Sequence, residues 1–506
     1  MNKMKIAAAV VFLLSLLVPS SLAAQQLASY PWAVTNILIC CEIIPASQSM
    51  NVEGEIVYNK TCDFDEMLSF DYATDSLKFH DENGKELPFH IDSNDIVLDS
   101  KIPLGSHTIH FEYSINFPAT YSNPFHLFIN ETYTNLEERW AWYPQFPHIL
   151  GTSAGVAFSS WFQAEITVTA PEGYTMVASG KMTGEKHAHG KTTRYFHTTN
   201  PVKGLGIYGG KYQSFVGQFK GIDFRILVSK DLNFTDAESW KDYIRKSLDF
   251  YIDRYGFFPF QNLYLIHQPF KMEGGGWGGP HGCFFIGGVN CFASGPLDIQ
   301  FCNFVAHEMF HQYLGSMIES TNKKNGTLVS EGMTEYASLI CADSFSPKPL
   351  LAQVIPAYVA TLKKIKYEED IEIMNVTSKH PHYLDYSYRK IPLFLLELRN
   401  LIGDARIKKI ERAFVNKYKF KELIGFPELL AEIKSETSGE EAVEELCKAW
   451  LEQKGVPPLS MPVVSTVDGR QETHRSISLE AREKSRRISF IQDIERSETL
   501  ERKIFH

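Results

Sequence analysis

The segment His307-Glu308-Met309-Phe310-His311 constrains this chain more than any other part of its sequence. Two histidines four residues apart lie on one face of an α-helix, about one turn apart, so both imidazoles can reach one metal ion. Glu308 projects to the side of that face, where it can hold a water molecule that zinc polarises. The segment therefore predicts a helix that carries a catalytic zinc site together with its general base.

A third zinc ligand is expected from a second helix. Catalytic zinc keeps three protein ligands and one open position, so the two histidines need one more partner. Glu331 is the candidate, because it opens an apolar stretch, Gly332 to Ala342, that is typical of a helix. Glu335 lies one turn further along and is predicted to orient a zinc-bound histidine or to meet the amine of a substrate. The predicted ligands of one zinc ion are thus His307, His311 and Glu331.

The alternative is a helix in which two unrelated histidines lie four residues apart. Large apolar residues fill the rest of this helix, which indicates a buried element: Phe304, Val305, Met309, Tyr313 and Leu314. Buried imidazoles and a buried carboxylate are costly without partners, and a metal ion would supply them. The metal site is therefore favoured over a chance pattern.

Composition and the N-terminus limit the class of protein. The 506 residues allow two or more domains, and 44% apolar and 22% charged residues are typical of a globular chain. The net charge of −10, with no basic block in the folded part, makes nucleic acid an unexpected partner. Lys3 and Lys5 precede an apolar run, Ile6 to Val18, that is too short for a comfortable membrane span. We therefore expect a signal peptide at 1–24 and export of the mature chain, secreted or periplasmic, without a stable membrane span; an uncleaved anchor is the alternative.

Eight cysteines fit an oxidising compartment, although their spacing does not dictate a pairing. Cys62 with Cys40 or Cys41, and Cys283 with Cys291, are candidate pairs. Buried free cysteines, which are common in proteins, are the alternative.

The pattern of apolar residues divides the chain into two folded parts. Short alternating runs separated by turn signals predict strands before residue 215: 51–58, 106–117, 161–170 and 192–197. Such strands without helices suggest an N-terminal β-sandwich or saddle-like domain over 25–215. After it, strands at 263–266 and 283–286 and mainly helical periodicity indicate an α/β domain over 216–458. Its predicted helices include 240–252, 298–317, 331–345, 391–401, 405–418, 427–434 and 439–453, and the charged residues 459–506 suggest a solvated tail.

Two further segments bear on the chemistry. The glycine-rich segment Glu273-Gly274-Gly275-Gly276 is predicted either to lie beside an extended peptide as an added strand or to form a plain hairpin turn. An oxyanion formed at a carbonyl needs one donor besides the metal, and a tyrosine suits this role. Tyr383, Tyr386 and Tyr388 are the candidates, with ordinary aromatic packing as the alternative.

The sequence resembles the gluzincin zinc aminopeptidases of the membrane alanyl aminopeptidase and leukotriene hydrolase type. The likeness is specific over 307–315 and 331–336, and it extends to Arg254–Pro259 and to Trp450–Leu459. It implies a multi-domain α+β fold, in which a saddle-shaped β domain precedes a thermolysin-like zinc peptidase domain. Tyr388-Arg389-Lys390 is similar to the family's catalytic tyrosine segment, which implies that Tyr388 is the oxyanion donor.

Two of the chain's departures from that family bear on how a substrate would be held. Gly274 to Gly278 takes the position of the family's Gly-x-Met-Glu-Asn strand, so the glutamate that binds a free amino terminus is missing. Glu273 would have to replace it from a shifted position. The family's large C-terminal helical domain, which closes the cavity, has no counterpart in this short sequence, and we expect a more open cleft.

These observations predict an exported, aminopeptidase-like zinc metallopeptidase that hydrolyses peptide bonds with zinc-activated water. Glu308 would act as general base and acid, and Tyr388 as oxyanion donor. The expected partner is a peptide or protein substrate, and the oligomeric state is not predicted. The alternatives are an endopeptidase or amidase with altered recognition of the amino terminus, or a non-catalytic peptide-binding protein on a peptidase scaffold.

Overall fold

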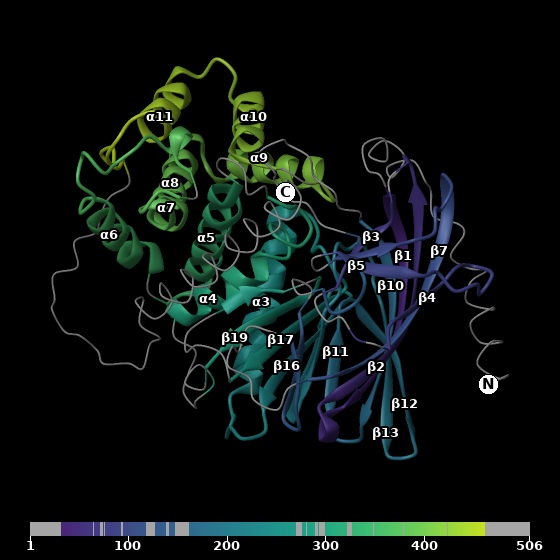
Figure 1. Cartoon of the computed structure of the whole chain (residues 1–506). Helices are drawn as coiled ribbons and strands as arrows, with labels where there is room; N and C mark the ends of the chain where they lie inside the picture. The colour runs from purple at the N-terminus through teal and green to yellow at the C-terminus, as the bar shows by residue number, and fades with distance from the viewer. Residues whose placement is uncertain are drawn as a thin grey trace.

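The computed structural model describes residues 32–460 apart from short segments, namely 64, 71–73, 75, 93–94, 118–126, 138–140, 147–160, 270–275, 280, 289–291, 293–298, 321–325, 348, 378 and 422–423. A strand-rich N-terminal unit lies beside a second unit, in which helices cover a smaller sheet (Figure 1). This arrangement confirms the predicted mixed α+β fold. The predicted signal peptide and nearly all of the predicted tail lie outside the described residues.

The N-terminal unit is built on one long sheet with two smaller sheets beside it. The long sheet has the order β12-β13-β10-β1-β2-β7-β4, and buried and partly exposed residues alternate along its central strands, as expected for a half-buried sheet. The predicted strands at 51–58, 106–117, 161–170 and 192–197 are confirmed as β2, β7, β10 and β13. The strands are β1 (Trp32–Ile44), β2 (Ser49–Lys60), β4 (Lys78–His80), β7 (Gly105–Asn116), β10 (Gln163–Pro171), β12 (Lys181–Ala188) and β13 (Lys191–His197), with β3 (Met67–Ser69), β5 (Phe89–Asp92), β6 (Asp95–Leu98), β8 (Phe128–Ile129), β9 (Tyr133–Leu136), β11 (Thr175–Ala178) and β14 (Ile207–Gly210) in the smaller sheets.

The register of β1 and β2 rules out the candidate disulfide of Cys62 with Cys40 or Cys41, and all three cysteines are free. Lys60 pairs with Trp32 at the start of β1, and Cys62 follows just beyond Lys60. Cys40 lies eight residues further along β1, which corresponds to roughly 26 Å at strand spacing. A disulfide requires Cα atoms within about 7 Å. Cys283 is also free, and Cys291 lies outside the described residues.

The second unit contains a five-stranded sheet in the order β15-β16-β17-β19-β18. Its strands are β15 (Tyr212–Phe219), β16 (Ile222–Ser229), β17 (Asn262–Gln268), β18 (Gly276–Gly278) and β19 (Cys283–Gly287). Both predicted apolar strands are confirmed as β17 and β19, which are buried throughout. β17 pairs with parallel neighbours on both sides, and β19 lies between parallel β17 and antiparallel β18. The predicted boundary between residues 215 and 216 falls inside β15, which pairs with β16.

The two helices that carry the candidate ligands differ in length from the prediction. α4 (Ile299–Phe310) ends well before residue 317, because Gly315 adopts a positive φ of 124° and the Ser316 N–H turns back to donate to the His311 carbonyl. α5 (Gly326–Phe345) begins before Glu331, and its buried Leu328 extends the apolar face in the N-terminal direction. Glu331 therefore lies inside the helix rather than at its start.

The remaining helices pack on these two. The helix predicted at 240–252 is confirmed as α3 (Ala237–Tyr255), and the four helices predicted after residue 390 are confirmed with small shifts at their ends. α6 was not predicted, nor was the short π-helix η6. These elements are α6 (Leu350–Leu362), α7 (Tyr383–Asp385), η6 (Tyr386–Lys390), α8 (Ile391–Ile402), α9 (Asp404–Tyr418), α10 (Phe426–Glu436) and α11 (Glu441–Leu451), with short helical turns at η3 (Pro45–Ser47) and η5 (Ile373–Asn375).

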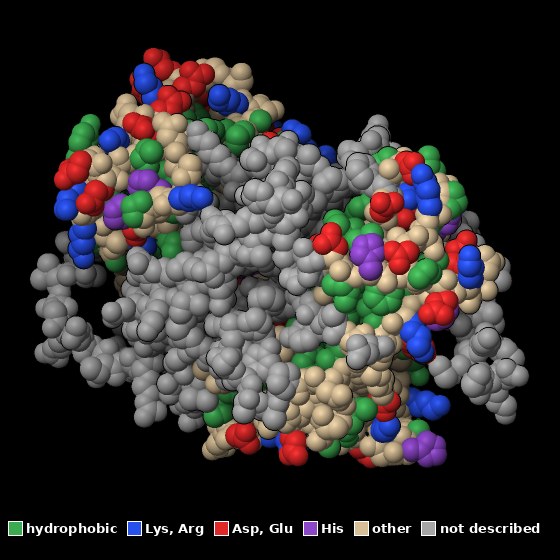
Figure 2. All heavy atoms as spheres, in the orientation of Figure 1, with side chains coloured by type: hydrophobic (Ala, Val, Ile, Leu, Met, Phe, Trp, Pro, Cys, Tyr) green, Lys and Arg blue, Asp and Glu red, His purple; other side chains and the backbone are tan. Residues whose placement is uncertain are grey.

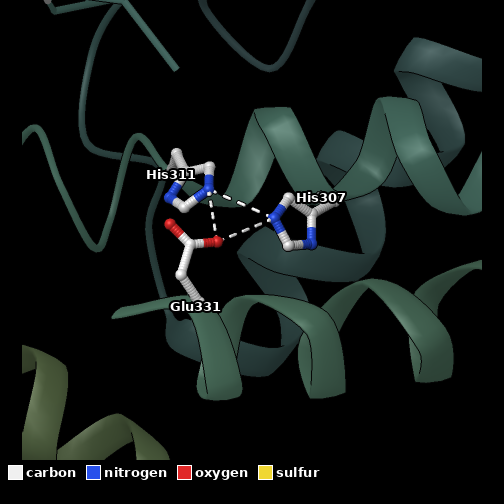
Figure 3. A group of neighbouring side chains, drawn as sticks. All are labelled: His307, His311 and Glu331. Carbon is white, nitrogen blue, oxygen red and sulfur yellow. Dashed lines mark hydrogen bonds and ion pairs between the residues drawn. The ribbon is translucent and has the colours of Figure 1, made fainter. Parts of the chain in front are cut away.

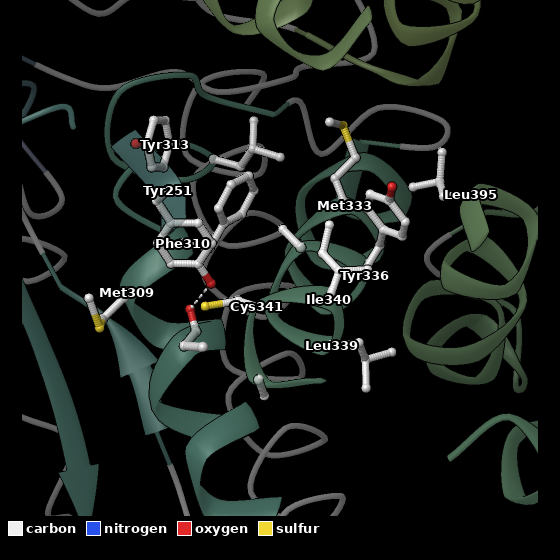
Figure 4. Packing of buried hydrophobic residues seen from close by; sticks show 14 of the residues in the cluster. Tyr251, Met309, Phe310, Tyr313, Met333, Tyr336, Leu339, Ile340, Cys341 and Leu395 are labelled. Carbon is white, nitrogen blue, oxygen red and sulfur yellow. Dashed lines mark hydrogen bonds between the residues drawn. The ribbon is translucent and has the colours of Figure 1, made fainter. Parts of the chain in front are cut away.

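A large apolar core surrounds the candidate ligand helices. Aromatic rings of α3 and of the end of α4 pack together, and apolar side chains of α5 face Leu395 of α8 (Figure 4). The ring centroids of Tyr251 and Phe310 lie 5.4 Å apart, a normal distance for paired aromatic rings. This packing fixes the positions of α4 and α5 relative to each other.

A separate apolar cluster joins the two units. It combines residues of the N-terminal unit with residues of the five-stranded sheet: Phe128, Tyr133, Val177, Tyr208, Tyr212, Leu227, Tyr264, Ile266, Cys283 and Phe285. Buried hydrogen bonds accompany it, since Gln268 Nε2 donates to Asn135 Oδ1 at 2.9 Å and Tyr133 Oη donates to Ser229 Oγ at 2.7 Å. The N-terminal unit is therefore bonded directly to the sheet beside the candidate site.

On the face shown in Figure 2, side chains of both charge signs are interspersed over the described parts of the two units. Among the described residues, we find no helix with the length and apolar character that crossing a membrane requires.

Candidate metal centre

His307 lies in the last turn of α4, His311 directly follows the end of that helix, and Glu331 comes from α5; the three side chains converge on one point (Figure 3). His307 Nε2 lies 3.2 Å from both Glu331 Oε2 and His311 Nε2, and His311 Nε2 lies 3.4 Å from Glu331 Oε2. Ligand atoms about 2.0–2.2 Å from a tetrahedral zinc ion stand about 3.3 Å apart. The three atoms therefore fit three corners of a zinc coordination sphere and leave the fourth open.

The other ring nitrogens fix the orientation of both histidines. His307 Nδ1 lies 2.8 Å from Glu335 Oε2, and His311 Nδ1 lies 2.9 Å from the Leu314 carbonyl oxygen. A carbonyl oxygen only accepts hydrogen bonds, so His311 Nδ1 carries a proton, and Nε2 of each ring is the atom that faces Glu331 Oε2 and can bind a metal. Histidines that bind zinc typically have such a carboxylate or carbonyl at the ring nitrogen that does not bind the metal, and we call this group the outer partner of the histidine.

The charges of the site also suit a cation. Burial lowers the pKa of His311, but the Glu331 carboxylate outweighs this effect and raises that pKa to about 9. Burial alone would raise the pKa of the Glu331 carboxyl, yet the neighbouring His311 and His307 hold that pKa well below its usual range. Glu331 is therefore an anion at neutral pH, and a metal ion that binds must displace the proton from His311.

Glu308 lies between the metal centre and the edge strand β18. A Cβ added at Gly276 would stand 2.9 Å from Glu308 Oε1 and 2.3 Å from the Phe304 ring, and one added at Gly278 would stand 2.6 Å from His311 Cβ. Only glycine lets the backbone approach so closely. Within the part of the chain that the structure describes, β18 pairs only with β19 and is the edge strand of its sheet, the position at which an extended peptide can be added as a further strand.

Tyr388 reaches the same place from η6. Its ring stacks on that of His307, with centroids 5.9 Å apart and an interplanar angle of 25°. Gly332 permits this packing, because a Cβ there would stand 2.4 Å from Ile391 Cγ2 and 3.2 Å from the Ser387 carbonyl oxygen. Single turns of π-helix are frequent at functional sites.

The structure brings together most of the residues singled out in the sequence. Glu308, Tyr388 and Glu335 surround the three candidate ligands, and Gly276 lies in β18. Glu273, Gly274 and Gly275 lie outside the described residues.

Two contributors were not found from the sequence. Tyr358 and Asn303 both donate to Glu335 Oε1, from α6 and α4. Tyr358 has apolar neighbours at helical spacing, but Pro356, two residues before it, disfavours a helix. Asn303 lies one helical turn before His307, and this spacing could have indicated from the sequence that it lies near the metal centre.

Comparisons with known proteins agree with this geometry. Residues 296–450 match the peptidase family M1 domain, a segment that includes the candidate ligands and Tyr388. A search among curated proteins found no significant match to the sequence.

Solved structures with the same fold include a mutant of the M1 zinc metallopeptidase of Deinococcus radiodurans. It is 16% identical with a TM-score of 0.66, over 85% of this chain and 97% of that one. A mutant of that enzyme bound to a Tyr-Ser-Ala substrate is 17% identical, with a TM-score of 0.66 over 86% and 97% of the two chains. A two-domain M1 zinc metallopeptidase mutant bound to L-arginine is 17% identical, with a TM-score of 0.65 over 86% and 97%. At these identities the likeness establishes a common fold.

Proposed function

The chain carries a peptidase family M1 domain and is a zinc metallopeptidase, and from this premise we propose that it is an exported, aminopeptidase-like enzyme. The observation that carries the proposal is the position of Glu308 between three converging zinc ligand atoms and the edge strand β18. An extended peptide paired with that edge would place a carbonyl beside both the metal centre and the general base.

Each residue then has a defined task. His307, His311 and Glu331 would hold a zinc ion, which when bound would lower the pKa of a bound water and polarise the scissile carbonyl. Glu308 accepts a proton from the attacking water and passes it to the leaving amine, so the same carboxyl serves as base and then as acid. Tyr388 donates a hydrogen bond to the developing oxyanion from its place beside His307.

The test of aminopeptidase action compares one peptide in two forms, with a free and with an acetylated amino terminus. An aminopeptidase needs the free ammonium group, and we expect turnover of the free form to exceed that of the acetylated form by at least about tenfold, as the loss of one charged contact implies. Cleavage products are identified by mass spectrometry, and release of single N-terminal residues supports the proposal. Equal turnover of the two forms would contradict it.

The second candidate is an endopeptidase or amidase. One observation favours it: the sequence has glycines at 274 to 276, where the resembling family has the Met-Glu-Asn sequence that binds a free amino terminus. Equal turnover of free and acetylated peptides, with cleavage at internal bonds, is the outcome that this candidate requires.

Export is proposed from the N-terminal sequence, in which a basic start precedes the apolar run Ile6 to Val18. The full chain would be expressed in a host with a secretory pathway, and the N-terminus of the recovered protein would be sequenced. We expect an exported protein that begins near Ala24 or Gln25. An intact N-terminus on protein retained in the cytoplasm would contradict export.

A further inference from the structure

Glu335 is a buried carboxylate whose two oxygens have different partners. Its Oε2 lies 2.8 Å from His307 Nδ1, and only about 2% of the side chain is exposed. Its Oε1 accepts a hydrogen bond from Tyr358 Oη at 2.5 Å and a longer one from Asn303 Nδ2 at 3.3 Å. The orientation of His307 therefore depends on how firmly Oε1 is held.

Of these two bonds to Oε1, the one from Tyr358 is the stronger by geometry. A hydroxyl that donates to a carboxylate at 2.5–2.7 Å forms a charge-assisted bond, about twice as strong as a neutral one. The bond from Asn303 is near the outer limit for an amide donor. Without the phenol, Oε1 would lose the shorter of these two hydrogen bonds in a buried place, and the carboxylate would be held less firmly in its present orientation.

The ring of Tyr358 is itself held in place. It is buried on α6, and the Arg389 guanidinium lies 5.9 Å from its ring centroid, within the range of cation–π contacts. Arg389 is bonded to Asp385 at 2.8 Å and directly follows Tyr388 in η6. Tyr358 thus contacts the helix turn that carries the proposed oxyanion donor as well as the carboxylate behind a proposed zinc ligand.

We propose that Tyr358 is a positioning residue for the metal centre, which acts through Glu335 to hold His307 ready to bind zinc. This inference rests on the proposed zinc site, and it adds a residue that contacts neither the metal nor the substrate. The phenol holds Oε1 of Glu335, Oε2 stands 2.8 Å from His307 Nδ1, and this contact keeps the imidazole turned so that Nε2 is directed at the metal position.

The test is Tyr358→Phe in the full chain, which removes one oxygen and leaves the ring against Arg389. Zinc affinity is measured by competition with a chelating dye, and folding is followed by circular dichroism. Loss of an outer partner of a zinc-binding histidine typically weakens metal binding by about 10- to 100-fold, and we expect an effect in this range.

The matched control is Tyr212→Phe, which removes a buried phenol that donates to the His267 carbonyl at 2.9 Å in the five-stranded sheet. Its zinc affinity should stay within about twofold of the original, since it contacts no residue of the metal centre.

Two more variants separate positioning from general packing. Glu335→Gln and the double variant Tyr358→Phe with Glu335→Gln should bind zinc equally weakly, because Tyr358 acts through Glu335. Replacement of Tyr358 by 4-aminophenylalanine keeps the ring volume and a weaker donor, and it should restore most of the affinity. This variant also serves as the test should Tyr358→Phe fail to fold.

The outcomes distinguish this inference from the function on which it rests. Stoichiometric zinc in the original protein with weakened binding in Tyr358→Phe supports both. Unchanged affinity in Tyr358→Phe, or equal loss in the Phe and aminophenylalanine variants, overturns the role of Tyr358 and leaves the zinc peptidase intact. An original protein that binds no zinc overturns the proposed function itself.

Discussion

Glu308 lies beside the zinc ligands rather than among them, which allows its chemistry to be separated from metal binding. Glu308→Gln keeps the shape of the side chain but removes the base, and a positioned general base contributes about 10²- to 10⁴-fold to turnover. We expect peptide turnover to fall by that factor while zinc content stays stoichiometric. Peptide assays and atomic absorption measure the two quantities.

The control for that substitution is Glu331→Gln, which should lose zinc together with activity because it removes a proposed ligand. Substantial turnover in Glu308→Gln would show that this carboxylate is not the base. It would also favour a different role for the edge of β18.

The close approach of β18 gives a second prediction at this scale. Gly278→Ala places a methyl group 2.6 Å from His311 Cβ, so the strand or the helix end must shift. Overpacking of this kind costs about 1–3 kcal/mol, and it should also weaken zinc binding. Chemical denaturation measures the first effect and dye competition measures the second.

Gly184→Ala is the matched control, because Gly184 also lies in a strand and an added Cβ would meet only the Tyr195 ring at an ordinary 3.8 Å. Its free energy of unfolding should change by less than about 0.5 kcal/mol. Equal effects of the two substitutions would mean that the spacing of β18 and α4 is not critical.

The residues that the sequence predicts are those whose roles follow from short-range spacing or from a resemblance. His307, Glu308 and His311 share one helical segment, and Tyr388 stands in a recognisable segment of its own. Tyr358 gains its place only when α6 packs against α5, so its contact with Glu335 depends on the fold rather than on local sequence.

At the scale of elements, α6 and η6 are two parts near the metal centre that the sequence pattern did not predict. α6 contains Pro356, which lacks a backbone N–H and normally ends a helix, yet the helix continues through it. η6 is a π-turn in which the Ile391 N–H donates to the Tyr386 carbonyl, and no residue type marks such a turn. Tertiary packing decides both, whereas buried strands and amphipathic helices such as α3 follow from apolar periodicity.

A buried ion pair joins α3 to α9 behind the metal centre. Arg254 donates through Nε to Glu411 Oε2 at 2.5 Å and through Nη2 to Glu411 Oε1 at 2.9 Å, and Nη2 also reaches Tyr336 Oη on α5 at 3.1 Å. Arg254→Met would leave the Glu411 carboxylate buried without its counter-charge. We expect a loss of about 3–5 kcal/mol in the free energy of unfolding, measured with denaturant.

The double variant Arg254→Met with Glu411→Leu removes both charges and should recover much of that loss. No recovery would show that the hydrogen bond to Tyr336, rather than the ion pair, holds the three helices together.

For the whole molecule, buried histidines predict how stability changes with pH. Burial, reinforced by Lys203, lowers the pKa of His281 to about 3, and its Nε2 accepts the Lys203 backbone N–H at 3.1 Å between the two units. The unfolded chain has the ordinary pKa near 6.5 and therefore binds more protons between pH 6.5 and 3. Stability contributed by neutral His281 is complete above pH 6.5 and is lost as pH falls, by about 3 kcal/mol at pH 4.

His281→Gln keeps an acceptor for the Lys203 N–H but cannot titrate. Thermal unfolding between pH 7 and 4 should therefore show a smaller decrease in melting temperature for this variant than for the original. Identical pH profiles would mean that other groups, such as the similarly buried His267, control acid unfolding.

The place of β18 at the edge of the described sheet has a consequence for the choice of substrate. A peptide that lies along this edge is recognised through its own amide groups, which every sequence has in common. Such an enzyme would select for an unfolded, extended chain and accept many different side chains, a behaviour suited to degrading mixed peptides. Methylation of a single backbone nitrogen at a paired position would then protect a peptide that is otherwise a good substrate.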